Sequence, residues 1–140
     1  MTRFATLVTP DTAKRLARLG GWTRVAFGTA FVVAPKTVAQ PWVGSGVDTP
    51  AAQLLTRSMG IRDLLLGVGL LRALRHDDRQ TAATWLEYGA AAGVIDAGAT
   101  IAAFPGLPRS GRTFLLFIIV ALGTDTLLAA QLRQEPTDDE

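Results

Sequence analysis

Apolar side chains gather in four stretches of the chain, at 19–35, 54–74, 83–104 and 113–132, separated by shorter segments rich in polar residues, Gly and Pro. Each stretch holds about 16–22 residues, enough for a helix to cross a hydrocarbon layer of ~30 Å at a rise of 1.5 Å per residue. The stretches are rich in Leu, Ala and Gly, and none alternates with a period of two, which excludes strands. The pattern therefore predicts an all-α fold, a four-helix transmembrane bundle.

The segments outside the apolar stretches are expected to be loops and tails. Lys36–Gln53 and Pro105–Arg112 contain several Pro and Gly residues, which are typical of loops. Asp11–Gly20 alternates basic and apolar side chains at helical spacing, so we expect a short N-terminal amphipathic helix on the membrane surface. Residues 1–11 and 134–140 are predicted tails.

The positions of the basic residues predict an orientation. Eleven Lys and Arg lie outside the helix interiors. Eight of them lie before the first stretch, around the segment between the second and third stretches, or after the fourth, all on one side of the predicted membrane. The other three lie in the remaining two linkers, on the opposite side. Because cytoplasmic loops carry an excess of Lys and Arg, we expect a multi-pass protein of the cell membrane with both termini in the cytoplasm. A soluble helical bundle remains the alternative, since no stretch offers 18 consecutive uncharged residues.

Composition narrows the function classes. The 140 residues allow a single domain, 1–140, of which 49% are hydrophobic and 19% charged. This composition excludes an intrinsically disordered chain and a nucleic-acid-binding tail. The absence of Cys and the single His exclude zinc fingers, iron–sulfur clusters and thiol catalysis, so no metal or cofactor is expected. The expected partners are membrane lipids and further copies of the chain, with no nucleic acid.

Ionisable side chains inside the apolar stretches are the candidate functional residues. A charge in the middle of a bilayer costs at least about 2.5–3.5 kcal/mol, so such groups face the bundle interior and pair with one another. Helical rise places Arg62 and Asp63 about 12 Å from the start of the second stretch, and Asp96 about 12 Å from the end of the third. In the predicted topology these two ends lie at the same, outer face of the membrane. We therefore predict an Arg62–Asp96 pair with Asp63 beside it.

A second group, the inner polar cluster, is expected from Arg24, Glu87 and Asp125. Glu87 and Asp96 are nine residues apart, about 180° around a helix, so they cannot line one face together. With Arg57, the two groups hold three positive and four negative side chains. One carboxylate should therefore lack a cationic partner, and burial should raise its pKa until it holds a proton.

Small residues mark the faces on which the helices meet. Gly60 and Gly67 share a helix face with Asp63, and Gly89 and Gly93 share one with Asp96. Faces of small residues allow two helix backbones to approach closely. We therefore expect these carboxylates on helix-packing faces.

Three functions fit such a cluster. The first is the binding of a small or lipid-like molecule, with ligand contacts from Arg57, Arg62, Asp63 and Asp96. The second is a membrane enzyme of isomerase or cyclase type, in which Asp63 or Asp96 is a general acid and Arg62 stabilises developing negative charge. The third is a proton-coupled carrier. Ion pairs that only fix the helix register are the structural alternative.

A motif in the second stretch resembles a known family. Arg57 precedes Gly60–Gly67, which reads G-x-R-D-L-x-L-G, and Pro41-Trp42-Val43-Gly44 lies upstream. These features resemble small four-helix integral membrane proteins of a domain-of-unknown-function family, found in actinobacteria and fungi, over about residues 16–132. The resemblance implies that architecture and a shared polar centre of Arg57, Arg62, Asp63 and Asp96. It implies no particular reaction.

Overall fold

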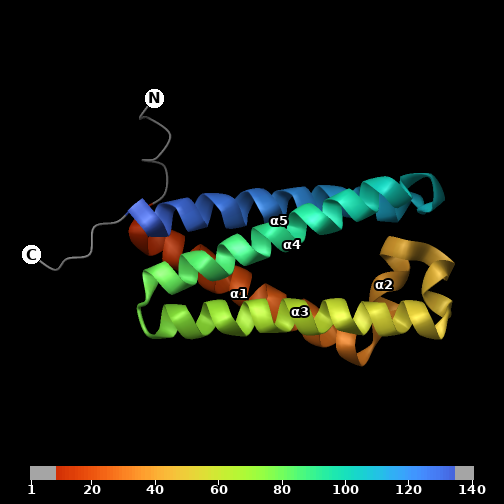
Figure 1. The fold of residues 1–140 in the computed structure, drawn as a ribbon, viewed down its shortest axis with the longest axis horizontal. Coiled ribbons are helices and arrows are strands. Elements are labelled where there is room, and N and C mark those ends of the chain that lie inside the picture. Colours follow the sequence, from red (N-terminus) through yellow and green to blue (C-terminus); the bar gives the residue numbers. More distant parts are fainter. Residues whose placement is uncertain (1–8, 135–140) are drawn as a thin grey trace, which may run out of the picture.

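The computed structural model describes residues 9–134, and this part of the chain is helical, with no strand (Figure 1). The all-α prediction is therefore confirmed for these residues. The helices are α1 (Pro10–Val33), α2 (Pro35–Val43), α3 (Pro50–Arg75), α4 (Arg79–Ala103) and α5 (Arg109–Gln134), with 3-10 turns η1 (Gly44–Asp48) and η2 (Phe104–Gly106). Apart from residues 9–11 and 134, the predicted tails lie outside the described residues.

Capping side chains set the starts of three long helices. Thr9, Thr49 and Asp78 each accept a hydrogen bond from the backbone N–H three positions further on, at 3.4, 3.2 and 2.9 Å. Such caps satisfy N–H groups that have no partner inside the helix. Proline follows at once in α1 and α3, where its missing N–H costs nothing. These three helices therefore begin four residues or more before the apolar stretches.

The prediction of a separate amphipathic helix at Asp11–Gly20 is wrong, because this segment is part of the first half of the continuous helix α1. Its Ala13 and Ala17 are fully buried in the main core, which holds the segment against the bundle. The loop expected at Lys36–Gln53 also contains structure, namely α2 and η1. These pack through Ala39 and Val47 against Phe31 in a second, smaller core.

Glycines bring α1 and α3 into close antiparallel contact. A Cβ atom built on Gly28 would lie 2.6 Å from the carbonyl oxygen of Gly60, and one on Gly67 would lie 2.7 Å from that of Gly21. Only a hydrogen fits at these positions, so the two backbones almost touch. The packing role predicted for Gly60 and Gly67 is confirmed.

The main core lies at the end of the bundle where α1 begins and α5 ends (Figure 1). Leu70 of α3, Leu86 of α4 and Leu132 of α5 are almost completely buried there. Four long helices therefore share one core at this end, and α2 with η1 covers part of the other end.

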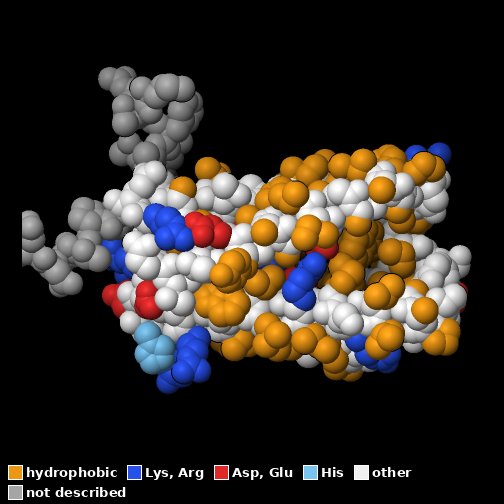
Figure 2. Space-filling view, viewed as in Figure 1, with side chains coloured by type: hydrophobic (Ala, Val, Ile, Leu, Met, Phe, Trp, Pro, Cys, Tyr) orange, Lys and Arg blue, Asp and Glu red, His pale blue; other side chains and the backbone are white. Residues whose placement is uncertain are grey.

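The prediction of a four-helix transmembrane bundle is wrong. Within residues 9–134, α5 alone is long and apolar enough to cross a membrane, and 22% of its most apolar window is buried in the bundle. The physical reason is charge: α1 carries three basic residues in its first half, and α3 carries Arg57, Arg62 and Asp63 within seven residues. A multi-pass arrangement needs several membrane-crossing helices, so the structure does not support that expectation. Figure 2 shows hydrophobic side chains along much of the visible surface, with charges gathered mainly towards one end.

The α1–α3 contact gives a test with a matched control. Gly28→Ala should lower the free energy of unfolding by about 1–3 kcal/mol, because its methyl group overlaps backbone atoms of α3. Gly98→Ala, at a helical position with nothing within 4 Å, should raise stability by about 0.5–1 kcal/mol. Unfolding followed by circular dichroism measures both variants. Equal effects of the two substitutions would contradict the close contact.

Candidate functional site

An Arg–carboxylate pair joins α3 to α4 at the middle of the bundle. Arg62 donates from Nη1 to Oδ1 of Asp96 at 3.0 Å and from Nη2 to Oδ2 at 2.7 Å. This bidentate geometry is the strongest form of side-chain ion pair. The predicted Arg62–Asp96 pair is confirmed, and so is Asp63 beside it, which accepts from Arg62 Nη2 at 3.4 Å.

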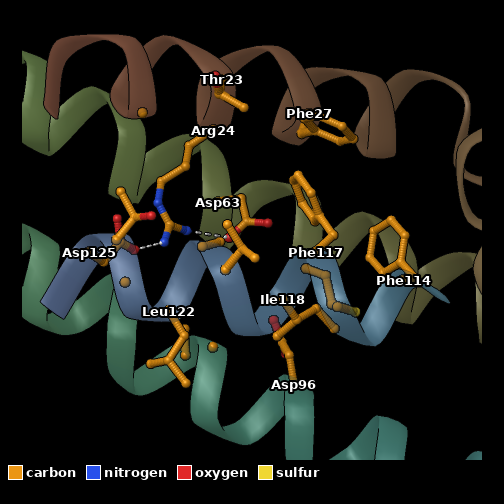
Figure 3. A pocket seen from close by; sticks show the side chains of 18 of the residues that line it. Thr23, Arg24, Phe27, Asp63, Asp96, Phe114, Phe117, Ile118, Leu122 and Asp125 are labelled. Atoms are coloured by element: carbon orange, nitrogen blue, oxygen red, sulfur yellow. Dashed lines mark hydrogen bonds and ion pairs between the residues drawn. The ribbon is translucent and has the colours of Figure 1, made fainter. Parts of the chain in front are cut away.

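Arg24 extends this pair into a chain of five charges. Figure 3 shows the two contacts of Arg24, with Asp63 and with Asp125. The Nη1 atom of Arg24 donates to Oδ1 of Asp63 at 3.2 Å, and its Nη2 donates to Oδ2 of Asp125 on α5. The order Asp125–Arg24–Asp63–Arg62–Asp96, called here the charge network, therefore connects all four long helices. The predicted association of Arg24 with Asp125 is confirmed, whereas their separation from Arg62, Asp63 and Asp96 is wrong, because Arg24 also contacts Asp63.

The glycine contacts explain why Arg24 meets Asp63. Gly21 lies against Gly67 and Gly28 against Gly60, so Arg24 and Asp63 occupy the levels between the two contacts. On α4, a Cβ atom at Gly89 would lie 2.5 Å from Arg24 Nη2 and 2.7 Å from Asp125 Oδ2. The absence of a side chain at Gly89 therefore leaves the space in which this ion pair forms.

Glu87 lies outside the charge network. It forms two 2.6 Å contacts with Arg133 near the end of α5, where both side chains are exposed. Nine residues separate Glu87 from Asp96, which places them on opposite sides of α4 as predicted. Its expected membership of the inner polar cluster is wrong for the same reason, since the inner side of α4 is the side of Asp96.

Arg57 also lies outside the charge network. Its Nε donates to the backbone carbonyl oxygen of Val32 at 3.2 Å, near the C-terminal end of α1. Carbonyl groups in the last turn of a helix have no partner inside it, and a cation there is favourable. The structure thus gives Arg57 a helix-end contact in place of the expected position beside Arg62 and Asp96.

The network holds three carboxylates and two guanidinium groups. The four carboxylates expected inside the apolar stretches, Asp63, Glu87, Asp96 and Asp125, each have a cationic partner. The expectation that one of them lacks a cation is therefore wrong. Burial nevertheless raises the pKa of Asp63, although the nearby Arg62 and Arg24 oppose the shift. Arg62 Nε is buried and has no hydrogen-bond partner in the described part of the chain.

A cavity of about 320 Å³ lies beside the charge network, with α1 and α5 on its two sides. One part of its lining is charged and comes from Arg24, Asp63, Asp96 and Asp125. The rest is mainly apolar, and small residues of α4, among them Ala92 and Gly93, leave space along one wall. Volumes of this size and apolar walls with a few polar groups are typical of sites for small ligands.

Aromatic rings form the apolar part of the cavity (Figure 3). The ring centres of Trp42 and Phe114 lie 5.0 Å apart, those of Phe114 and Phe117 5.5 Å, and those of Phe117 and Phe27 5.7 Å. Sequence reasoning missed this aromatic wall. The available signal was the spacing of Phe114 and Phe117, three residues apart and hence on one helix face.

Within residues 9–134, no group of three or more His, Cys, Asp or Glu is arranged to hold a metal ion. The three carboxylates of the network are instead bound by guanidinium groups. Comparison with protein-family models, curated proteins and solved structures finds no match to the chain. The resemblance based on the Gly60–Gly67 motif stays a prediction.

The Arg62–Asp96 pair can be tested with a double-mutant cycle. Arg62→Leu should destabilise the fold by about 2 kcal/mol, because it leaves the Asp96 carboxylate without its cation. The figure is below that for a fully buried pair, because the two side chains are 32% and 19% exposed. Arg62→Leu/Asp96→Val should recover most of the loss, as chemical denaturation would show.

The exposed Glu87–Arg133 pair is the control for that cycle, and Glu87→Gln should cost less than Arg62→Leu. A double variant no more stable than Arg62→Leu alone would contradict the assignment of Arg62 as the cation that compensates Asp96.

The raised pKa of Asp63 predicts a pH dependence. When the folded-state pKa lies above the unfolded one, the stabilisation is complete below the unfolded pKa and is lost as pH rises through the folded pKa. Asp63→Asn removes this titration. The stability of the wild type relative to Asp63→Asn should therefore fall as the pH rises above about 4, the ordinary pKa of an Asp side chain. Denaturation at a series of pH values measures the difference, and a difference that grows with pH would contradict the shift.

Proposed function

We propose that this protein binds a lipid-like or other small amphipathic molecule in the cavity between α1 and α5. The apolar part of the ligand would lie along the aromatic wall, and its polar head would meet the charge network. The observation that carries the proposal is the juxtaposition of an apolar cavity and partly buried, mutually paired charges. Apolar lining supplies affinity in such sites, and a few polar groups fix orientation.

The exposed edges of the cavity support an elongated ligand. Leu19 of α1 and Val120 of α5 belong to the lining and are 64% and 66% exposed. The cavity therefore opens to the outside between these helices. Its volume of about 320 Å³ is near the lower end of the range for small-molecule sites. A longer chain would leave through the opening while its head stays at the network.

The charges that face the cavity define the head that would fit. Three aspartates and Arg24 line it, whereas Arg62 lies behind Asp63 and Asp96 and is not part of the lining. Ionised carboxylates are hydrogen-bond acceptors only. A head with hydroxyl or amino donors would therefore find several acceptors, and Arg24 offers the one guanidinium that the described residues contribute to the lining.

The proposal places the protein at the cell membrane. The support is α5, which is long and apolar enough to cross a bilayer. We further propose that the end of the molecule where α5 finishes faces the cytoplasm. The excess of Lys and Arg in the sequence segments at this end supports that orientation.

A cavity-filling variant tests ligand binding. Ala121→Phe places a large side chain in the cavity, whereas Ala130→Phe places the same side chain on an exposed part of α5. Mass spectrometry of small molecules retained by the purified full chain should find a molecule on the wild type and on Ala130→Phe. At least a tenfold loss is expected for Ala121→Phe, equivalent to about 1.4 kcal/mol of binding free energy.

Equal retention by the two phenylalanine variants would contradict binding in this cavity. The same samples address the enzyme alternative. Incubation of the retained molecule with fresh protein should leave its mass unchanged if the protein only binds it. A product of isomerisation or cyclisation has the same mass, so chromatographic retention must be followed as well. Conversion that is lost in Asp63→Asn would favour the enzyme.

A further inference from the structure

A second groove lies between α1 and α3, near the end where α3 finishes. Its volume is about 710 Å³. Arg18, Trp22 and Val25 line it from α1, and α3 contributes mainly Arg72, Arg75 and apolar side chains. His76 completes the lining at the end of α3. In Figure 2 the pale blue histidine and the blue side chains beside it mark this end of the molecule.

The register of α1 and α3 explains why three arginines meet here. Gly21 lies against Gly67, and the helices are antiparallel. Arg18 lies one turn before Gly21, and Arg72 lies just over one turn after Gly67, so both reach the same end of the contact. Arg75 follows one turn later on the same face as Arg72.

These arginines are available to a ligand. Within the described part of the chain, the side chains of Arg18, Arg72 and Arg75 form no ion pair and no hydrogen bond. The nearby Asp77 is taken by Lys14, at 2.7 Å. Arg72 and Arg75 are favourable at the C-terminal end of α3 because of its helix dipole, but that argument does not apply to Arg18 in α1.

Exposed apolar groups continue from the arginines along the groove. Trp22 is 59% exposed and Val68 is 47% exposed, and both belong to the lining. Ile61 and Leu65 extend the exposed apolar surface along α3. A basic cluster beside a tryptophan and an apolar strip is complementary to a negatively charged head attached to a hydrocarbon chain.

We propose that this groove binds an anionic phospholipid, with its phosphate between Arg18, Arg72 and Arg75 and an acyl chain along Trp22 and Val68. Arginine suits this role because its planar guanidinium can donate two hydrogen bonds to one phosphate. The site is separate from the cavity beside the charge network and does not depend on the function proposed for that cavity.

Short-chain lipids test the assignment on the full chain in an uncharged detergent. Dihexanoyl phosphatidylglycerol should quench or shift the fluorescence of Trp22 and bind more tightly than dihexanoyl phosphatidylcholine or inorganic phosphate. Each arginine near an anionic lipid contributes about fivefold in affinity. Arg18→Gln/Arg72→Gln should therefore weaken phosphatidylglycerol binding by about 25-fold and abolish the preference over phosphatidylcholine. Trp22→Phe should lose the signal.

Two further double variants serve as controls. Arg109→Gln/Arg112→Gln removes the same charge at the opposite end of the bundle and should leave binding within about twofold of the wild type, since the groove is unchanged. Arg18→Lys/Arg72→Lys keeps the charge but loses the paired guanidinium donors, so it should bind phosphatidylglycerol less tightly than the wild type and more tightly than phosphatidylcholine. This variant tests the site if the glutamine variant fails to fold.

Three outcomes would overturn the proposal. One is equal binding of the two lipids by the wild type. Another is an unchanged lipid preference in Arg18→Gln/Arg72→Gln. The third is inorganic phosphate binding as tightly as phosphatidylglycerol, which would identify a site for free phosphate.

Discussion

The charge network is the constraint on which the arrangement of the four long helices depends. Asp125, Arg24, Asp63, Arg62 and Asp96 come from α5, α1, α3 and α4, and each carboxylate contacts a guanidinium. A partly buried charge that loses its partner is strongly destabilising, so the helices cannot rotate or slide independently. Aspartate side chains are short, and the contacts form only if the backbones are close. The glycine pairs of α1 and α3, and Gly89 on α4, provide that closeness.

The cavity follows from the same arrangement. Close packing ties α1 to α3, and α4 packs extensively on α5, while α1 and α5 meet much less closely. Small residues on α4 do not fill the space that remains, and aromatic rings from α1, α2 and α5 border it. An apolar cavity next to a charged cluster is therefore a consequence of how the helices are tied together. Burial of the network beside the cavity also explains why the carboxyl of Asp63 has a raised pKa.

The sequence predicts some of these contacts because helix geometry alone decides them. Equal axial depth was enough to pair Arg62 with Asp96, and a nine-residue spacing was enough to separate Glu87 from Asp96. The prediction places Arg24 with Asp125 correctly but misses its contact with Asp63, because it counts the level of Arg24 from the start of an apolar stretch at residue 19. Helix α1 in fact begins at Pro10, and its register against α3 is set by glycine contacts that hydropathy does not reveal. The sequence does not predict helix α2, because several Pro and Gly residues are typical of a loop, although Pro35 in fact occupies the first turn of the helix.

Apolar length alone overestimates the number of helices that are long and apolar enough to cross a membrane. The charges of α1 and α3 that form the network also reduce the apolarity of those helices, and α5, which contributes the single carboxylate Asp125 to the network, keeps a long apolar window. The same chemistry therefore decides both properties. Arginines facing inward pair with aspartates and fix the bundle, whereas Arg72 and Arg75, facing outward at the end of α3, have no ion-pair partner among residues 9–134. The cavity inside carries an excess of negative side chains and the groove outside an excess of positive ones. Two amphipathic ligands of different head charge would be distinguished by this contrast alone, without any difference in the apolar surfaces that hold their chains.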